Sequence, residues 1–257
     1  MSTLLSVPRT VRLARWNAVL LRRNTLALTF ATAMPLLPLL LLLTGDRGEP
    51  GVGIAAVIST MTMALLFPVF YNVLSQFVTR RDELVLKRLR TGEARDVELL
   101  VALALPGGII TALLGLAVIP LAMAAGQMAP RNVVLYLLSI VLTIVMYAAF
   151  AFWTAAWTRN AEAAQLTSAP VIMLALVGQL SVSFPDAVQR WTDLTPGAAL
   201  TNIVRVCWFG FESRADTSTL SFADTWAQAV SPILVLIAWT ALAIALAQRS
   251  LRWEPRS

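Results

Sequence analysis

The sequence contains no histidine, one cysteine (Cys207) and one lysine (Lys87). The lack of histidine excludes a histidine base, a histidine proton relay and a histidine metal site. A single cysteine cannot form a disulfide within the chain or a multi-thiolate metal site. No glycine-rich run leads into Lys87, so a phosphate-binding loop of the GxxxxGK[ST] type is absent. We therefore predict no catalytic residue and no metal site in this chain, and any nucleotide must be bound by another chain.

Charged residues are also scarce. Only 13% of the residues are charged and 58% are apolar, and the mean hydropathy is +0.74. Soluble domains carry about 25% charged residues, so this composition is typical of an integral membrane protein. The net charge of +6 is better explained by arginines that set membrane topology than by nucleic-acid binding. We expect contact with the lipid bilayer and no nucleic-acid partner.

Six apolar segments each approach the ~20 residues that a helix needs to cross a hydrocarbon core of ~30 Å. Several contain proline, which membrane helices tolerate where neighbouring helices support them. We expect the third span to be broken at 106–108 and again at Pro120. The sequence thus predicts an all-α, polytopic membrane protein with one domain, 1–257, and six transmembrane helices. The predicted spans are 26–43, 52–77, 99–125, 132–157, 163–184 and 227–247.

The distribution of arginine predicts the orientation. An even number of spans places both termini on one side, and with the termini inside, the inner segments hold fifteen of the twenty basic residues. Lysine and arginine are enriched on the cytoplasmic side of membrane proteins. We therefore expect both termini and the segment 79–98 to be cytoplasmic, and the segment 185–226 to lie outside.

The segment 1–25 carries five arginines and no acidic residue. Its pattern predicts a basic amphipathic helix in the headgroup layer, with Arg12 and Arg15 holding it on the cytoplasmic side and Trp16 at the interface. A cleavable signal peptide is the alternative. The apolar region is too long for one, and no small-residue cleavage pattern precedes Gly45.

The segment 79–98, called the elbow below, is the most charged part of the chain, with six basic and five acidic residues. Glu83 and Lys87 form an acid-before-base pair four residues apart, which favours a short helix. Thr91-Gly92 should end that helix, because glycine tolerates the left-handed conformation. A docking surface for a soluble partner and an ordinary solvated loop are both compatible with this pattern.

No acidic or basic residue lies well inside a predicted span. This argues against an ion-coupled carrier and against an intramembrane hydrolase. The polar side chains in or near the spans are those of Asn72, Gln76, Gln165 and Gln179. They could bond neighbouring helices, or Asn72, Gln76 and Gln179 could line a substrate path.

The outer segment 185–226 contains an apolar run, AALTNIVRVCWFGF, that is too short to cross a bilayer. Pro196 suits the first turn of a helix, and Thr195 could cap it. Such a segment dips into the membrane or lies at its surface. A structural lid and a gate for leaving substrate are both open interpretations.

The order of these features resembles the membrane subunit of a type-2 ATP-binding-cassette exporter, over nearly the full length. The similar stretches are the basic helix RTVRLARWNAVLLRRN, the elbow RRDELVLKRLRTGEARDVELL and the outer LTPGAALTNIVRVCWFG. The resemblance places Pro196, Arg205 and Gly210 at matching positions of a re-entrant hairpin. Leu84-Val85-Leu86 departs from the family's usual Gly-Thr, and Gly92 from its common proline.

The resemblance implies that the elbow is a coupling helix seated on a cytoplasmic ATPase, which binds the ATP and magnesium. The residues expected at that contact are Arg80, Arg81, Asp82, Glu83, Leu86, Arg88, Leu89 and Arg90. It also implies pairing with an identical or paralogous permease chain.

The expected function is efflux of a hydrophobic or amphipathic compound, such as a drug, a lipid or a lipid-like metabolite, across a bacterial inner membrane. A scaffold or sensor that recruits a soluble partner through 79–98 is the alternative. An ion-coupled carrier ranks third.

Overall fold

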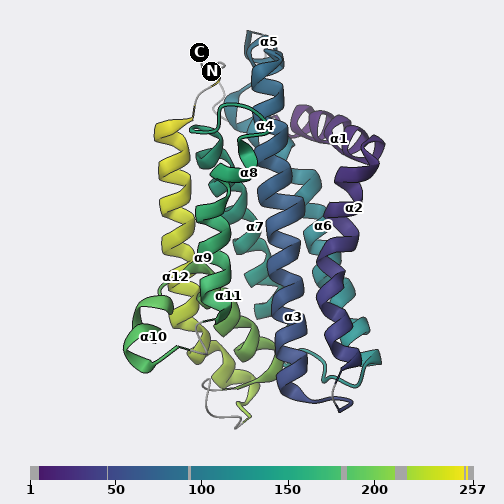
Figure 1. The fold of residues 1–257 in the computed structure, drawn as a ribbon, viewed down its shortest axis with the longest axis vertical. Coiled ribbons are helices and arrows are strands. Elements are labelled where there is room, and N and C mark those ends of the chain that lie inside the picture. The colour runs from purple at the N-terminus through teal and green to yellow at the C-terminus, as the bar shows by residue number, and fades with distance from the viewer. Residues whose placement is uncertain are drawn as a thin grey trace.

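The computed structural model describes residues 6–44, 46–91, 94–180, 184–211, 219–251 and 253. These residues form a bundle of roughly parallel helices, with α1 (Val7–Arg23) lying across one end (Figure 1). Among the described residues, Phe211 and Thr219 form an isolated antiparallel β-bridge.

Among the described residues, five apolar helical segments are long enough to cross a membrane. One is α2 (Thr25–Leu36) with the 3₁₀ helix η1 (Leu37–Leu43), and the next joins α3 (Pro50–Leu65), the π-helical turn η2 (Leu66–Tyr71) and α4 (Asn72–Asp82). The others are α6 (Asp96–Ala124), α7 (Val133–Ala155) and α12 (Phe222–Ser250). The prediction of an all-helical membrane protein is thereby confirmed.

The predicted fifth span, 163–184, is a shorter helical segment in the structure. It consists of α8 (Ala164–Thr167) and α9 (Ala169–Leu180), which together fall short of the length of the other five. Pro170 explains the break, because proline lacks an N–H and its ring conflicts with the carbonyl four residues earlier. The count of six spans is therefore not confirmed for the described residues, and 181–183 lie outside them.

The expected breaks at 106–108 and at Pro120 are wrong. α6 is continuous through Pro106, Gly107, Gly108 and Pro120. Gly107 sits against the carbonyl oxygen of Pro68, where a Cβ atom would lie only 1.9 Å from that oxygen. The glycine therefore allows η2 to approach α6 closely instead of ending the helix.

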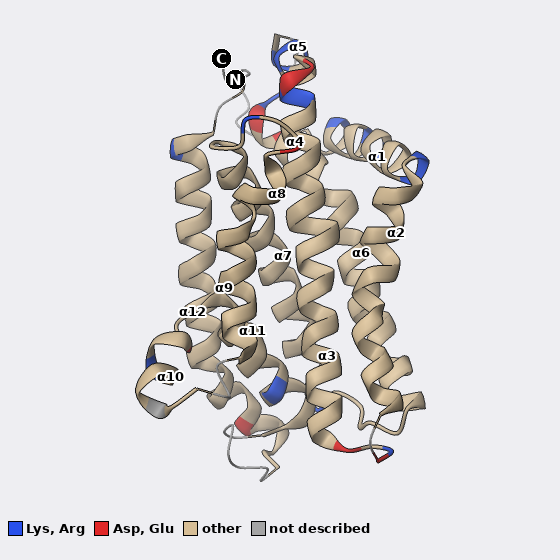
Figure 2. Cartoon of the chain, in the orientation of Figure 1, with Lys and Arg blue, Asp and Glu red and all other residues tan. Residues whose placement is uncertain are grey.

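Helix α1 packs on α6 through an inward face made of Thr10, Ala14, Asn17 and Leu21. Except for half-buried Arg9, its arginines are exposed, and Trp16 is 65% exposed. Charged residues gather at the end of the bundle that carries α1 and α5, with fewer at the opposite end (Figure 2).

Candidate functional site

The elbow begins within one helix and ends within another. Helix α4 continues to Asp82, the chain turns at Leu84, and α5 (Val85–Thr91) follows before α6 begins at Asp96. Leu84 has a φ of 59°, a left-handed conformation that costs a residue with a side chain about 1–2 kcal/mol. As a result, α5 projects beyond the end of the bundle (Figure 1).

Arg90 ties α5 to its neighbours. Its Nε and Nη2 donate to the two carboxylate oxygens of Asp96 at 2.7 and 3.1 Å. Its guanidinium carbon also lies 4.7 Å from the centroid of the Trp253 ring. A bidentate pair fixes direction as well as distance, so α5 is held at a defined angle to the start of α6.

The residues expected to contact an ATPase fall into three groups. The exposed ones are Asp82, Glu83, Arg88 and Arg90. Arg80 and Leu89 are half-buried, and Arg81 and Leu86 are buried. A docking partner can therefore reach the first group directly, while the buried pair faces the interior of the chain. Gly92 lies outside the described residues.

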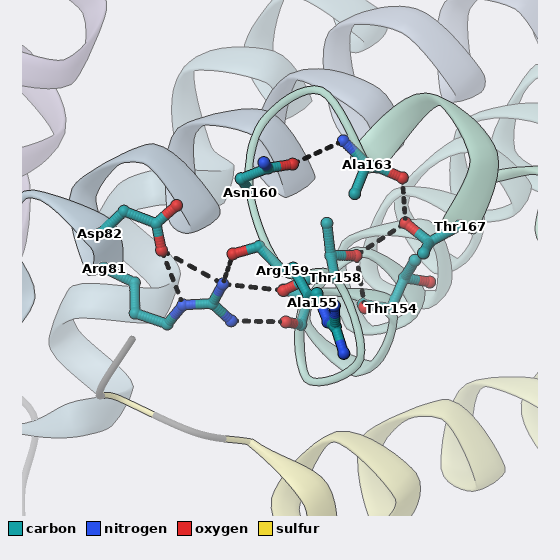
Figure 3. A network of polar contacts seen from close by, with 9 residues as sticks. All are labelled: Arg81, Asp82, Thr154, Ala155, Thr158, Arg159, Asn160, Ala163 and Thr167. Carbon is teal, nitrogen blue, oxygen red and sulfur yellow. Dashed lines mark hydrogen bonds and ion pairs between the residues drawn. The ribbon is translucent and has the colours of Figure 1, made fainter. Parts of the chain in front are cut away.

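Arg81 is the largest correction to this set, because its side chain is fully buried. Nη1 donates to the carbonyl oxygen of Ala155 at 2.8 Å, and Nη2 donates to those of Thr158 and Arg159 at 2.7 and 2.9 Å (Figure 3). Nε and Nη2 also donate to Asp82 at 3.3 Å. The guanidinium thus joins the base of the elbow to the end of α7, where free carbonyls and the helix dipole favour a positive charge.

The same network reaches α8. The hydroxyl of Thr158 bonds that of Thr167 at 2.7 Å, and Thr167 Oγ1 donates to the carbonyl of Ala163 at 3.0 Å (Figure 3). Asn160 accepts from the Ala163 N–H at 2.8 Å. The loop from α7 to α8 is therefore held in one shape against the elbow.

A basic depression of about 430 Å³ lies between α1 and the elbow. Its lining residues are Arg9, Arg12, Leu13, Trp16, Arg88, Leu89 and Ala94. Arg9 contacts Glu98 at 3.4 Å, while Arg12 and Arg88 are exposed. This arrangement suits an acidic group on a docking protein. Arg15 is exposed elsewhere on α1.

A larger cavity of about 530 Å³ opens between α2, the η2–α4 segment and the α8–α9 segment. Aromatic rings and uncharged polar groups share its wall, and none of the described residues that line it is acidic or basic. The lining residues are Asn24, Leu26, Ala27, Phe30, Phe67, Tyr71, Asn72, Ser75, Gln165, Ser168 and Ile172. Such a wall suits an uncharged ligand that has both apolar and hydrogen-bonding parts.

The three predicted substrate-path residues separate in the structure. Asn72 lines the larger cavity, whereas Gln76 bonds Asn72 from the next turn of α4, at 2.8 Å. Gln179 Nε2 donates to the Thr62 hydroxyl and to the Ile58 carbonyl, which bonds α9 to α3. In this structure, the side chains of Gln76 and Gln179 thus form hydrogen bonds within the protein.

The model of the ABC-2 type transporter family matches residues 11–191. The chain belongs to this family. The matched residues include the elbow and every residue that lines the larger cavity. No curated protein matches the sequence. An ABC-2 permease is a membrane component that is not itself catalytic and works with a cytoplasmic ABC ATPase.

The C-terminal part of this ABC-2 permease, beyond the matched residues, contains α11 (Pro196–Val204) and the π-helical turn η4 (Arg205–Phe209). Thr195 caps α11 by accepting from the Ala198 N–H, as its position predicts. The turn between α10 (Asp186–Thr192) and α11 is fixed by Trp239, whose Nε1 donates to the Leu194 carbonyl at 2.6 Å.

Glycines set the close contact between α9 and α11. A Cβ on Gly178 would lie 1.9 Å from the backbone nitrogen of Ala198, and a Cβ on Gly197 would lie 2.0 Å from the carbonyl oxygen of Ala175. The start of α11 therefore packs directly on the middle of α9.

The three residues matched to the re-entrant hairpin are all placed by the structure. Pro196 is buried at the first position of α11, and Arg205 is buried with its guanidinium 5.8 Å from the Phe211 ring centroid. Gly210 ends η4 with a φ of 68°. A side chain there would be strained and would meet the Arg131 side chain.

Two buried polar residues that hold α1 against α6, Glu98 and Asn17, were not identified from the sequence. Glu98 accepts from the backbone N–H groups of Ser6 and Arg95 at 2.8 and 3.2 Å, which anchors the start of α1. Its position three residues after Arg95, at the start of α6, is the available signal. Asn17 shares a helical face with Thr10 and Ala14, a spacing that could have identified a packed polar face.

Proposed function

We propose that this ABC-2 permease is the membrane subunit of an ATP-driven exporter that moves a hydrophobic or amphipathic compound out of the cytoplasm. The larger cavity carries the proposal. Its wall combines Phe30, Phe67 and Tyr71 with amide and hydroxyl groups and contains no charge among the described residues. A drug, a lipid or a lipid-like metabolite fits such a wall better than an ion or a highly charged solute.

The partner ATPase is proposed to dock on the exposed part of the elbow and on the neighbouring basic depression. Glu83 and Arg88 are exposed on the elbow, and Arg12 and Arg88 supply positive charge between α1 and α5. ATP and magnesium would be bound by that partner. This end would face the cytoplasm of a bacterial cell, with both termini inside.

A second permease chain, identical or paralogous, is proposed to cover α2. Only 11% of the most apolar stretch of Thr25–Leu43 is buried, against 67% for Pro50–Asp82. Because α2 forms one wall of the larger cavity, a second chain there would close the cavity into a path. We also propose that α10 and α11 form a re-entrant hairpin at the outer end of that path.

Affinity purification from native membranes in mild detergent tests this function. We expect the tagged chain to recover a nucleotide-hydrolysing partner, and Arg88→Glu to lose it through charge reversal. Glu83→Arg is a second elbow variant. Arg190→Glu is the matched control, because Arg190 is also exposed but lies on α10 at the other end. Equal recovery of the partner with Arg88→Glu and with Arg190→Glu would refute the proposed docking surface. A chain that purifies without any nucleotide-hydrolysing partner would favour the scaffold or sensor.

A further inference from the structure

A chain of directed hydrogen bonds runs along one face of α4, from the elbow to the cavity wall. Arg80 Nη2 donates to Gln76 Oε1 at 3.1 Å, and Gln76 Nε2 donates to Asn72 Oδ1 at 2.8 Å. Asn72 Nδ2 then donates to the carbonyl oxygen of Pro68 at 3.2 Å. The spacing of four residues places these side chains above one another on the helix.

A second arm leads from the same guanidinium to helix α1. Arg80 Nη1 donates to Asn17 Oδ1 at 2.6 Å, and Asn17 Nδ2 donates to the carbonyl oxygen of Ala102 on α6 at 2.6 Å. Asn17 is 5% exposed. Arg80 therefore bonds α1 and, through it, α6, as well as the face of its own helix.

The polarity of both arms is determined by their ends. A guanidinium can only donate, so the atom of Gln76 and the atom of Asn17 that meet Arg80 must be oxygens. A backbone carbonyl can only accept, so each arm must also end with an amide N–H on Pro68 or Ala102. Each amide has one orientation that satisfies both neighbours. The donor at Arg80 and the acceptor at Pro68 together set how Gln76 and Asn72 are oriented at the cavity wall.

The two ends of the first arm lie at functional positions of the proposed exporter. Asn72 and Ser75 line the larger cavity, together with Phe67 and Tyr71 of the π-helical turn η2. Arg80 lies at the base of the elbow, next to Arg81, whose buried guanidinium joins α4 to the end of α7. Pro68 removes a backbone donor in η2, and π-helical turns are frequent at functional sites.

We propose that Arg80 is a positioning residue that links the position of the elbow to the wall of the cavity. Displacement of the end of α4 relative to α1 breaks the Arg80–Asn17 bond, which frees Arg80 and Gln76 to reorient. The Gln76–Asn72 bond and the turn at Pro68 then change with them. This chain of hydrogen bonds can then adopt two arrangements. They give the elbow and the cavity the shared two-state element that coupling requires. This inference rests on the proposed function.

The test measures the accessibility of the cavity wall in the complex with its copurified ATPase. Ser75→Cys is placed in a Cys207→Ala background, since Cys207 is the chain's single cysteine. The rate of labelling by N-ethylmaleimide is compared in lipid nanodiscs without nucleotide and after trapping with ATP and vanadate. With Arg80 present, we expect the rate to differ by about fivefold or more between the two states.

Three variants within this chain of hydrogen bonds, and a fourth outside it as the control, isolate its contribution. Arg80→Gln should abolish most of the difference, and Arg80→Lys should restore it because lysine keeps a charged donor. Gln76→Leu removes only the arm toward the cavity and should have the effect of Arg80→Gln. Gln179→Leu, which removes the bonds to Thr62 and Ile58 outside this chain, should leave the difference intact.

The outcomes separate the two proposals. A nucleotide-dependent difference that survives both Arg80→Gln and Gln76→Leu overturns the role of Arg80 and leaves the exporter standing. If Arg80→Gln does not fold, Gln76→Leu alone decides. The absence of an ATPase, or of any nucleotide response in the Ser75→Cys parent, overturns the proposed function and this inference together. Equal loss with Gln179→Leu would show a general packing effect and also refute the role of Arg80.

Discussion

Arg81 supplies hydrogen-bond donors where a helix end lacks them. The carbonyl of Ala155, the last residue of α7, and those of Thr158 and Arg159 all receive N–H groups from its guanidinium. The last carbonyls of a helix have no intrahelical donor, and leaving a buried one unpaired costs about 1–3 kcal/mol. A planar side chain with five donors serves several acceptors at once, which lysine cannot do in this geometry.

Arg81→Met should therefore destabilise the chain. It removes the donors from these carbonyls and leaves Asp82 without its cation, so we expect the free energy of unfolding to fall by roughly 2–4 kcal/mol. Arg88→Met is the control, because exposed Arg88 should change stability by less than about 0.5 kcal/mol. Equilibrium unfolding of the purified protein in detergent micelles measures both. Equal stability of the two variants would show that the buried network contributes little.

Close packing between helices depends on individual glycines in this bundle. Gly107 meets the Pro68 carbonyl of η2, while its neighbour Gly108 meets only a side-chain methyl of Ile144, with a Cβ distance of 3.1 Å. A methyl group on a side chain can move by a few tenths of an ångström more easily than a backbone carbonyl can. The two adjacent glycines should therefore respond differently to the same substitution.

Gly107→Ala should destabilise the bundle by about 2 kcal/mol or more, because the added methyl group overlaps backbone and forces α6 away from η2. Gly108→Ala should cost clearly less, since the higher helix propensity of alanine offsets part of the contact. Thermal unfolding of the two variants under the same detergent conditions provides the comparison. A larger loss for Gly108→Ala would contradict the packing described between α6 and η2.

The long helices follow from hydropathy, but the side-chain contacts between them do not. The apolar runs around α6, α7 and α12 predicted those helices, because each run exceeds the length of a bilayer core. The burial of Arg81 was not predictable, since its charge placed it in water and its carbonyl acceptors lie more than seventy positions along the chain. For the same reason, the sequence predicted Asn72 as a candidate but not the cavity, whose three walls come from separate segments.

The two ends of the bundle differ in chemistry. One end carries α1, the elbow and the last turn of α12, and it collects most of the basic residues; the other carries α10 and fewer charges (Figure 2). Lysine and arginine are retained on the cytoplasmic side during insertion. The charge asymmetry of the whole molecule therefore predicts that the elbow is inside the cell and α10 is outside.

Labelling of single cysteines in intact cells tests this orientation. Thr91, at the end of α5, and Ala187, on α10, are both exposed. Each is replaced by cysteine in a background that carries Cys207→Ala. We expect a membrane-impermeant maleimide to label Ala187→Cys in intact cells and Thr91→Cys only after the cells are permeabilised. Neither change alters the number of charges, so the topology signal is preserved. Labelling of Thr91→Cys in intact cells would reverse the orientation and place the elbow beyond the reach of a cytoplasmic ATPase.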